Sequence, residues 1–382
     1  MGVGIKSISL INLEPGDDCD SQSSYLQHHT APIRDVRRAL SRLKNMKRLP
    51  VCFIILVAML LQFHLSTRTR NRHDRGCSSI STGLAYPRVT GVDCVDLLRS
   101  TEIGRSITVT KTAAREPFFI CHVDPKVDNV ISATIQSTGL WDVHVLSALE
   151  ETIGDKCREN KRLTLDVGTN LGFFTNAMLA LGCHVWGFEM QPTALSLVQT
   201  SACLNKFTHR LELTLGAVSD KAERLKMIDA SAGNLGGIFI LKENDTSPFV
   251  EVESQRLDVL LKDVNESILV MKMDIEGHEP TALKGASRLF EKRMVHNIIL
   301  EVSPLVTGID SAVDMLRQLW QHGFTRVHEL HFTPPQDYGK EMKTRSLVFD
   351  TDSSTRDFVE KLVNVGDIRG ERFTDLLLSL ES

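Results

Sequence analysis

One short stretch constrains the fold of this chain more than any other: RLTLDVGTNLGFFTNAMLALG, residues 162–182. Leu163–Val167 is an apolar run with the length of a buried strand. It ends in a turn that contains two glycines and an asparagine, and a helical apolar pattern begins directly after this turn. We therefore predict a strand that passes through a glycine turn into a helix, an arrangement that binds ligands beyond the carboxyl end of the strand.

Apolar runs alternate with helical patterns from about residue 139 onward. Strands are predicted at Leu163–Val167, His184–Phe188, Leu211–Val218, Ile268–Met273, Asn297–Val302, Thr325–Leu330 and Ser346–Phe349. Helices are predicted at Trp141–Ile153, Phe174–Leu181, Ala194–Asn205, from Thr281 onward, and at Ser311–His322. This alternation predicts an α/β fold with a doubly wound, mostly parallel, seven-stranded sheet that helices cover on both faces.

The N-terminal part of the chain differs from the rest in charge and in hydropathy. Residues 1–75 hold 12 Lys and Arg against 6 Asp and Glu, whereas the remainder holds 32 against 42. A body with this acidic excess lacks the clustered cations that neutralise phosphates, so we predict no nucleic-acid partner. An uninterrupted apolar run at Val51–Leu61 extends with its neighbours over residues 49–65, near the lower limit for spanning a bilayer.

This apolar segment predicts a membrane anchor rather than a cleaved signal peptide. A signal peptide starts within a few residues of the N-terminus, and about 50 residues precede this segment. The basic residues in front of it favour a cytosolic N-terminus. We predict a single-pass type II protein whose body lies in the lumen of the Golgi or endoplasmic reticulum. Acceptor triplets for glycosylation at Asn244 and Asn265 agree with this placement. The alternative is a buried core helix in a cytoplasmic protein.

The turn after the first predicted strand has the chemistry for a small ligand with an amino acid tail. A dinucleotide fingerprint would need glycines at positions 168, 170 and 173, but the chain has Asn170 and Phe173 at two of them. Gly168 and Gly172 fit a tight turn that lets the backbone approach a ligand. Asp166 can accept from an ammonium group, and backbone N–H groups at the helix start can hold a carboxylate.

A second acidic residue stands at the end of the next predicted strand. Glu189 lies in the segment WGFEMQP, and its two carboxylate oxygens match the two hydroxyls of a ribose. A carboxylate at a helix N-terminus is the structural alternative. Because the two motifs occur in order on consecutive strands, together they indicate an adenosyl ligand.

A third motif, ILVMKMDIEGHE at residues 268–279, resembles the Lys-x-Asp-x-Glu-Gly-x-Glu signature of FkbM-type methyltransferases. These enzymes use S-adenosylmethionine and have the Rossmann-like class I methyltransferase fold. The resemblance runs from about residue 139 to residue 348. It implies a set of cofactor-binding residues from the first turn, the second strand and the segment GAVSD: Asp166, Gly168, Asn170, Gly172, Glu189, Ala217, Val218 and Ser219.

Methyl transfer to a hydroxyl needs a base, because an aliphatic alcohol is barely ionised at neutral pH. The resemblance places Asp274 beside the reactive methyl, and we predict Asp274, Glu276 and His278 as the catalytic candidates. A lone histidine in a loop is commonly structural. Glu301 can shape the acceptor pocket or form an ion pair. Asp274 and Glu301 could together hold a metal ion, but their pattern is too vague to predict a metal site.

The chain accordingly divides into five parts. They are a flexible basic cytosolic tail (1–48), a transmembrane signal-anchor (49–65), a stem with an N-terminal extension (66–130), a methyltransferase domain (131–352) and C-terminal closing helices (353–382). Six cysteines follow the anchor, and an even number in a lumenal domain allows disulfides whose pairing the sequence leaves open. No spacing of Cys and His indicates zinc.

The predicted function is O-methylation of a hydroxyl on a glycan, glycolipid or other small acceptor, with S-adenosylmethionine as cofactor. One alternative is a type II membrane glycosyltransferase, because Asp350-Thr351-Asp352 has the form of an Asp-x-Asp metal motif. We interpret that triplet as a turn or helix cap, since it lies in a polar stretch after the last predicted strand. The other alternative is a catalytically silent scaffold with a methyltransferase-like domain, which the intact motifs argue against.

Overall fold

The computed structural model describes residues 107–228, 236–241, 245, 247–367 and 371–381. All of them belong to the second of two compact units into which the chain divides, Leu84–Ser382. The predicted tail (1–48), the predicted signal-anchor (49–65) and Asn244 lie outside the described residues. Among the described helices, none has the length and apolar character needed to cross a membrane.

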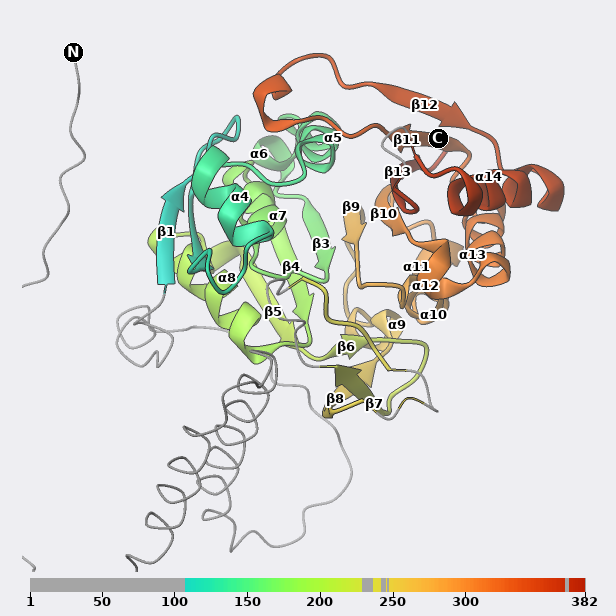
Figure 1. The fold of residues 1–382 in the computed structure, drawn as a ribbon, viewed down its shortest axis with the longest axis horizontal. Helices are drawn as coiled ribbons and strands as arrows, with labels where there is room; N and C mark the ends of the chain where they lie inside the picture. The colour runs from blue at the N-terminus through green and yellow to red at the C-terminus, as the bar shows by residue number, and fades with distance from the viewer. Residues whose placement is uncertain (1–106, 229–235, 242–244, 246, 368–370, 382) are drawn as a thin grey trace, which may run out of the picture. The chain divides into compact units, whose positions relative to one another are not determined.

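The core of the described unit is an eight-stranded mixed sheet (Figure 1). Its strands are, in spatial order, β12 (Thr344–Leu347), β11 (Arg326–Leu330), β13 (Thr374–Ser379), β10 (Asn297–Val302), β9 (Ile268–Met273), β3 (Leu163–Val167), β4 (His184–Glu189) and β5 (Leu211–Leu215). Neighbours from β10 to β5 pair in parallel. The predicted α/β sheet is therefore confirmed, but its predicted count of seven strands is corrected to eight.

The additional strand is β13, which corrects the prediction that residues 353–382 form closing helices. The helix α14 (Asp352–Asn364) forms as expected, but β13 runs antiparallel between β10 and β11. Its leucines alternate between the faces of the sheet: Leu376 and Leu378 belong to one core cluster and Leu377 packs against the other. A strand that is covered on both faces has an unbroken apolar run, which by sequence resembles a buried helix.

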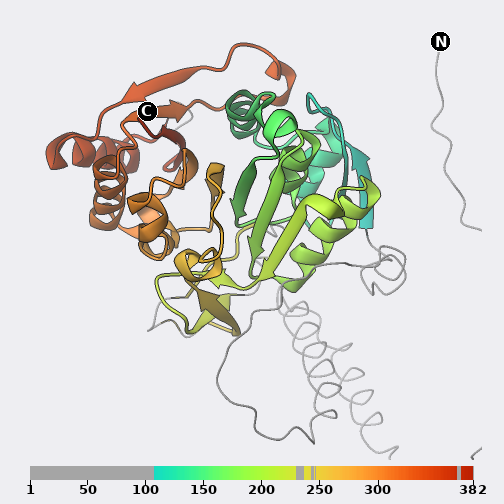
Figure 2. The same ribbon diagram turned by 180° about the vertical axis from the view of Figure 1, so that it is seen from behind.

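Helices cover both faces of the sheet, as Figures 1 and 2 show from opposite sides. One core cluster contains residues of α5 (Val143–Ile153), α7 (Phe173–Ala180) and α8 (Pro192–Leu204). The other contains residues of α10 (Glu279–Lys284), α11 (Ser287–Glu291), α13 (Ile309–Gln321) and α14. Both clusters include buried side chains of β9 and β10, so these central strands are apolar on both sides. The four helices predicted with both of their bounds lie within two residues of their expected bounds.

A hairpin formed by β1 (Ile107–Lys111) and β2 (Phe119–Val123) packs on α8, with α4 (Ile131–Thr138) following it. The backbone N–H of Cys121 donates to Ser201 Oγ at 2.8 Å. Phe118 and Ile120 are 1% and 0% exposed. These residues lie in the segment that we predicted as stem and extension, so the folded domain begins before residue 131. The hairpin belongs to it because its apolar side chains complete the core against α8.

A small three-stranded sheet lies between β5 and β9 in the chain. After β5 the chain enters a three-stranded sheet of β6 (Ala217–Val218), β8 (Phe249–Gln255) and β7 (Arg224–Ile228). The predicted strand Leu211–Val218 is thus divided at Gly216 between two sheets. The helix α9 (Leu257–Leu260) then leads into β9.

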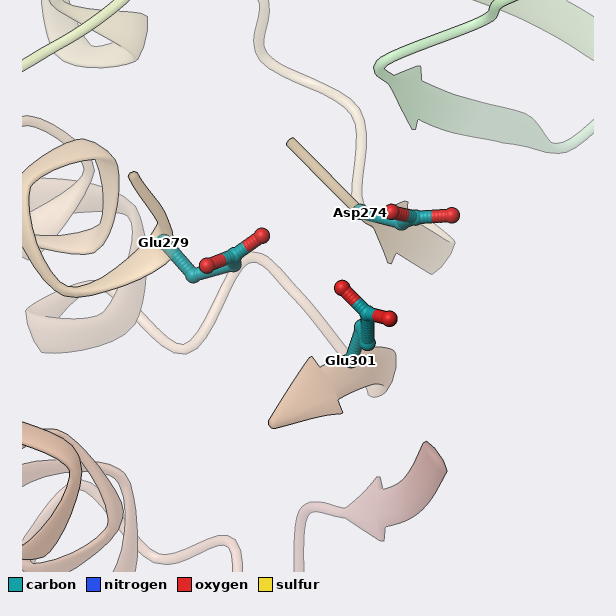
Figure 3. A group of neighbouring side chains, drawn as sticks. All are labelled: Asp274, Glu279 and Glu301. Carbon is teal, nitrogen blue, oxygen red and sulfur yellow. The ribbon is translucent and has the colours of Figure 1, made fainter. Parts of the chain in front are cut away.

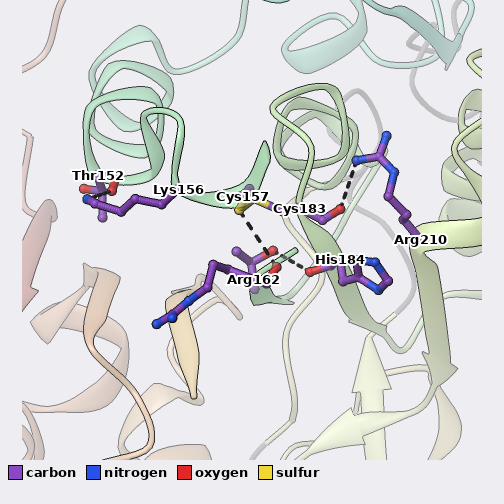
Figure 4. The surroundings of a disulfide bond; sticks show 8 residues. Thr152, Lys156, Cys157, Arg162, Cys183, His184 and Arg210 are labelled. Carbon is purple, nitrogen blue, oxygen red and sulfur yellow. Dashed lines mark hydrogen bonds between the residues drawn. A yellow bond between two sulfur atoms is a disulfide. The ribbon is translucent and has the colours of Figure 1, made fainter. Parts of the chain in front are cut away.

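A disulfide joins Cys157 in α6 (Lys156–Asn160) to Cys183, the residue before β4 (Figure 4). The two Cα atoms are 4.7 Å apart and the bond closes a loop over 26 positions. Cys203 is also disulfide-bonded. Among the described cysteines, Cys121 is a free thiol, and it is buried. The sequence allowed disulfides without giving their pairing; of the described cysteines, Cys157, Cys183 and Cys203 form them and Cys121 does not.

Candidate functional site

The turn between β3 and α7 is shaped by glycine. Gly168 has φ +84°, Asn170 has φ +51° and Gly172 has φ +86°, all in the left-handed region. A Cβ on Gly168 would lie 2.0 Å from the backbone oxygen of Asp274. The ends of β3 and β9 therefore touch through their backbones, and a side chain at position 168 would separate them. Gly172 begins α7, and a Cβ there would meet Val198 Cγ2 at 2.8 Å.

Glu189, at the end of β4, is held by the same turn. Its Oε2 accepts from the backbone N–H of Asn170 at 2.8 Å, and its Oε1 accepts from that of Gln191 at 2.9 Å. The residue is only 5% exposed, and burial raises the pKa of Glu189 although those N–H groups lower it. Each carboxylate oxygen keeps a lone pair beyond these bonds. The side chain of Glu189 is thus fixed in place, and both of its oxygens can still accept a hydrogen bond from a ligand.

Asp166 is fully buried and lies beneath the turn. Its Oδ2 accepts from Thr175 Oγ1 at 2.5 Å, and its Oδ1 lies 4.0 Å from Lys272 Nζ without a hydrogen bond. Burial raises the pKa of Asp166, and the charge of Lys272 opposes that shift. Burial by itself lowers the pKa of Lys272. The negative charges of Asp274 and Asp166 outweigh this effect and raise the pKa of Lys272 above its ordinary value. The pair fixes the ends of β3 and β9 relative to each other.

A cavity opens at this edge of the sheet and encloses about 610 Å³ of empty space, including the part open to solvent. Five of the eight predicted cofactor-binding residues line it: Gly168, Asn170, Glu189, Ala217 and Val218. Asp166, Gly172 and Ser219 are not among its lining residues. Phe188, Ile238 and Ile240 supply apolar surface. We refer to this space as the cofactor cavity.

The segment after β9 forms a tight turn with two left-handed residues, Glu276 (φ +56°) and Gly277 (φ +92°). The backbone N–H groups of Ile275 and Gly277 donate to Glu279 Oε1 at 2.8 and 3.2 Å. Glu279, the first residue of α10, therefore holds this turn in place. Asp274, whose side chain is 35% exposed, lies at the start of the turn with its Oδ2 3.1 Å from Lys272 Nζ.

His278 lies on the cofactor side of this turn. It lines the cofactor cavity, and its Nε2 is 3.1 Å from Ser219 Oγ. Burial lowers the pKa of His278, while Asp220 and Glu223 oppose that shift. The contact places Ser219 beside the cofactor cavity although it does not line it.

A second cavity adjoins the first and encloses about 1530 Å³ of empty space, including open solvent. Asn170, Asp274 and Glu276 line both cavities, as does Gly236. The remaining wall combines aliphatic and hydroxyl side chains with aromatic and acidic ones. Its residues include Trp141, Asp142, His144, Glu301, Phe332 and Asp375. We refer to this space as the acceptor cavity; Asp274 and Glu276 stand where the two meet.

Several carboxyl groups that line the acceptor cavity have raised pKa values. Burial, followed by the charges of Asp274 and Glu279, raises the pKa of Glu276 to about 8. Burial raises the pKa of Asp142 to about 7, with His144 opposing the shift. Burial and the charges of its acidic neighbours also raise the pKa of Glu301. Glu276 is therefore largely protonated at neutral pH, which makes it a poor base there.

Sequence reasoning missed three residues of this cavity. Asp142 and His144 lie at the start of α5, and Asp375 lies in β13. His144 Nε2 is 2.8 Å from Asp375 Oδ2, and the side chains are 3% and 14% exposed. Asp142 and His144 lie in the predicted helix Trp141–Ile153, where no sequence motif marked them as site residues. Nothing pointed to Asp375, because its strand was read as a helix.

The Asp350-Thr351-Asp352 triplet is structural. Thr351 caps α14: its Oγ1 accepts from the backbone N–H of Ser354, and Ser354 Oγ bonds back to the N–H of Thr351. Asp352 Oδ1 accepts from Arg317 Nε at 2.8 Å. The helix-cap interpretation is confirmed, and the triplet is far in sequence from every residue that lines the cofactor cavity.

Comparison with known proteins agrees with this geometry. Residues 166–326 match the family model described as the methyltransferase FkbM domain, a span that contains Asp166, Glu189 and Asp274. Among curated proteins, no sequence matches this chain.

Solved structures also resemble the chain, weakly. A SAM-dependent methyltransferase from Agrobacterium tumefaciens is 8% identical with a TM-score of 0.38, over 72% of this chain and 70% of that one. The METTL16 MTase domain is 9% identical with a TM-score of 0.33, over 76% and 93%. WbdD is 13% identical with a TM-score of 0.36, over 75% of this chain but only 47% of that one.

Proposed function

We propose that this chain, whose residues 166–326 belong to the FkbM family of S-adenosylmethionine-dependent methyltransferases, methylates a hydroxyl group of a glycan, glycolipid or other small acceptor. The observation that supports it is the continuity of two cavities at the carboxyl edge of the sheet. They share Asp274, with the family's cofactor residues on one side and a wall that includes acidic and aromatic side chains on the other.

The residues of the cofactor cavity fit the cofactor that the family implies. Glu189 keeps free lone pairs for a vicinal diol while two backbone N–H groups hold it in place. The glycine at position 168 lets the ends of β3 and β9 approach each other, where a side chain would meet the backbone of Asp274. Phe188, Val218 and Ile238 offer apolar surface suited to a purine. Asp166, which does not line the cavity, acts as a support for the turn.

When bound, S-adenosylmethionine supplies an electrophilic methyl group, so the protein has mainly to align the acceptor and exclude water. Asp274 is the residue placed for this task, because it lines both cavities. Its carboxylate can accept a hydrogen bond from the acceptor hydroxyl and orient the oxygen toward the cofactor cavity. The buried Lys272, 3.1 Å from Asp274, holds that carboxylate in position.

The proton of the acceptor hydroxyl can go to Asp274 or to the His144–Asp375 pair, both of which line the acceptor cavity. Glu276 holds a proton of its own at neutral pH, since its pKa is raised to about 8. His278 lines only the cofactor cavity and contacts Ser219, which favours a role in shaping the cofactor site.

A polyhydroxylated acceptor suits the wall of the acceptor cavity. Trp141 and Phe332 offer apolar ring faces, and Glu301 and Asp375 offer acceptors for hydroxyl groups. This mixture of flat apolar surface with carboxylates is chemically complementary to a sugar ring.

A lumenal position of the catalytic domain is part of the proposal. The predicted anchor at residues 49–65 motivates it, and two features of the described residues support it. The Cys157–Cys183 disulfide is typical of an oxidising compartment. Asn265, in a glycosylation triplet, is exposed. Glycosidase treatment of the expressed full chain should reduce its apparent mass, and Asn265→Gln should remove part of that change. A chain that shows no change would contradict the lumenal placement.

The central test is binding and transfer with labelled S-adenosylmethionine and the full-length chain. We expect saturable binding that S-adenosylhomocysteine competes, followed by transfer of label to oligosaccharide or glycolipid hydroxyls. Binding with transfer only to nitrogen or carbon acceptors would overturn the O-methylation proposal. Absence of binding would overturn the proposed function altogether.

A further inference from the structure

Three carboxyl groups from separate parts of the chain lie close to one another (Figure 3). Asp274 follows β9, Glu279 begins α10 and Glu301 lies in β10. One oxygen from each lies within 4.8 Å of the others. Two of these residues, Asp274 and Glu301, also line the acceptor cavity. Figure 3 shows the carboxylates of Glu279 and Glu301 extending into the space between the three side chains.

The position of Glu279 gives a second, separate indication of a missing ligand. This residue is 0% exposed. Its Oε1 is satisfied by two backbone N–H groups of the 274–277 turn, but its Oε2 is buried and has no hydrogen-bond partner. Glu301 Oε2 is likewise buried without a partner. A buried carboxylate oxygen without a partner is costly, so the two oxygens together mark a place that a positive ligand would fill.

The protein supplies little positive charge to this cluster. Among the described residues, Lys272 forms an ion pair with Asp274 of this cluster, with its Nζ 3.1 Å from Asp274 Oδ2, and no described cation forms an ion pair with Glu279 or Glu301. The same lysine is shared with Asp166. Three clustered carboxyl groups therefore face one lysine that already pairs with another acid, and the buried Oε2 atoms of Glu279 and Glu301 have no hydrogen-bond partner.

We propose that Asp274, Glu279 and Glu301 hold a divalent cation, Mg²⁺ or Mn²⁺. Carboxylate oxygens are the ligands that these hard cations prefer, and the three residues offer no sulfur or nitrogen. Ligand oxygens that all lie within 4.8 Å of one another can close around one ion at bonds of about 2.1 Å with modest side-chain rotation. Mg²⁺ keeps some coordination positions for water or substrate, and the acceptor cavity provides access to them through Asp274 and Glu301.

The catalytic consequence rests on the proposed function. An acceptor hydroxyl bound to the ion becomes more acidic, as metal-bound water does. Because Asp274 is then a ligand of the ion, the proton of the acceptor hydroxyl passes to the His144–Asp375 pair. The new bond then forms between the acceptor oxygen and the methyl carbon while the carbon–sulfur bond of the sulfonium donor breaks and its electron pair stays on sulfur. The ion is neither oxidised nor reduced.

The test is Mn²⁺ binding to the full-length, metal-depleted chain, followed by electron paramagnetic resonance without cofactor or acceptor. We expect one tight site per chain, which Mg²⁺ displaces. Glu301→Gln and Glu279→Gln should each weaken Mn²⁺ binding by at least about 100-fold, because each removes a direct ligand. Glu279→Gln keeps a carbonyl oxygen for the 274–277 turn, and a cooperative thermal transition with unchanged circular dichroism will show that each variant folds.

Two controls separate coordination from simple charge. Glu276→Gln removes a carboxyl group from the same junction without touching the three ligands, and Glu291→Gln removes an exposed one on α11. We expect less than about tenfold weakening in the first and none in the second. Equal weakening in Glu276→Gln and Glu301→Gln would overturn the proposed ligand set, and so would wild-type chain without a tight Mn²⁺ site.

Failure of this proposal can be told apart from failure of the proposed function. If labelled S-adenosylmethionine binds but Mn²⁺ does not, the cation site is wrong and the methyltransferase stands. If Mn²⁺ binds at this cluster but the cofactor does not, the cation site stands and the proposed function is wrong. If both bind, chelation followed by return of Mg²⁺ should abolish and then restore transfer, and transfer unaffected by chelation would overturn the catalytic role of the ion.

Discussion

The two cavities at the carboxyl edge of the sheet are built on opposite principles. In the cofactor cavity, both oxygens of the acidic residue Glu189 are bonded to backbone N–H groups, and Gly168 lets the ends of β3 and β9 touch. In the acceptor cavity, Glu301 and its neighbour Glu279 each keep a buried oxygen without a partner. The carboxylate of the cofactor cavity thus has protein partners for both oxygens, whereas the carboxyl groups at the acceptor cavity include oxygens that no protein group contacts by a hydrogen bond.

The two cavities should therefore respond to different kinds of substitution. The cofactor cavity is shaped by backbone, so it should respond most to changes in volume and little to the loss of a distant charge. The acceptor cavity is shaped by carboxyl groups, so it should respond to pH, to cations and to isosteric removal of charge. The variants below test that contrast in order of expected effect.

Gly168→Ala should abolish detectable binding of S-adenosylmethionine. Its Cβ would lie 2.0 Å from the backbone oxygen of Asp274, so β3 and β9 must separate. The matched control is Gly339→Ala, because Gly339 has the same kind of backbone (φ +83°) but no atom within 4 Å of the added Cβ. We expect that control to bind the cofactor within about twofold of wild type, since it bears only the backbone strain of roughly 1 kcal/mol. Equal binding by both variants would refute a backbone-shaped cavity.

Asp274→Asn and Glu189→Gln should have opposite kinetic signatures. Loss of the charge on Glu189 should weaken cofactor binding by about 10- to 100-fold, the value of a hydrogen bond to a charged group. Asp274→Asn should leave cofactor affinity within about threefold while turnover falls about 100-fold. Isothermal titration and single-turnover transfer measure the two quantities. The same loss of affinity in both variants would show that the cavities are not separate in function.

Asp375→Asn should lower turnover about tenfold and leave cofactor binding unchanged. The amide oxygen can still accept from His144 Nε2, but the negative charge that stabilises a protonated imidazole is gone. The measurement is the pH profile of single-turnover transfer. We expect its ascending limb to shift to lower pH in the variant, because His144 then loses its proton more easily. An unchanged profile would remove this pair from the proton path.

Asp142→Asn should change how stability depends on pH. Burial raises the folded-state pKa of Asp142 to about 7 from an ordinary value of 3.8, with His144 and Lys272 opposing and Asp375 and Asp274 assisting that shift. The folded protein then binds more protons than the unfolded chain, so the free energy of unfolding falls as pH rises between about 4 and 7. One group contributes a slope of at most about 1.4 kcal/mol per pH unit.

Urea unfolding of wild type and Asp142→Asn at pH 5 and pH 7.5 measures this slope. Asparagine suits the left-handed backbone at this position (φ +35°), so the variant isolates the charge. We expect it to lose less stability than wild type between the two pH values. Equal losses would mean that the acceptor cavity tolerates the charge on Asp142 after all.

The residues around the turn between β3 and α7 could be predicted, because the local sequence pattern identifies the turn and the parallel strand order fixes which segments lie next to it. The carboxyl ends of parallel strands lie at the same edge of the sheet, so motifs after β3, β4 and β9 had to meet. Glycines at 168 and 172 and the acid at 189 are readable from the chain alone. The turn after β9 could be placed at this edge, but whether His278 faced the cofactor or the acceptor depended on the conformation of a two-residue left-handed turn.

The sequence by itself thus determined the fold class, and it predicted five of the residues that line the cofactor cavity. Only the tertiary structure decided the acceptor side. His144 and Asp375 are 231 positions apart and meet because β13 inserts between β10 and β11. Glu279 gains its role from a backbone turn, and its buried oxygen becomes significant only beside Glu301. Such long-range pairings leave no periodic trace along the chain, since packing rather than local propensity selects them.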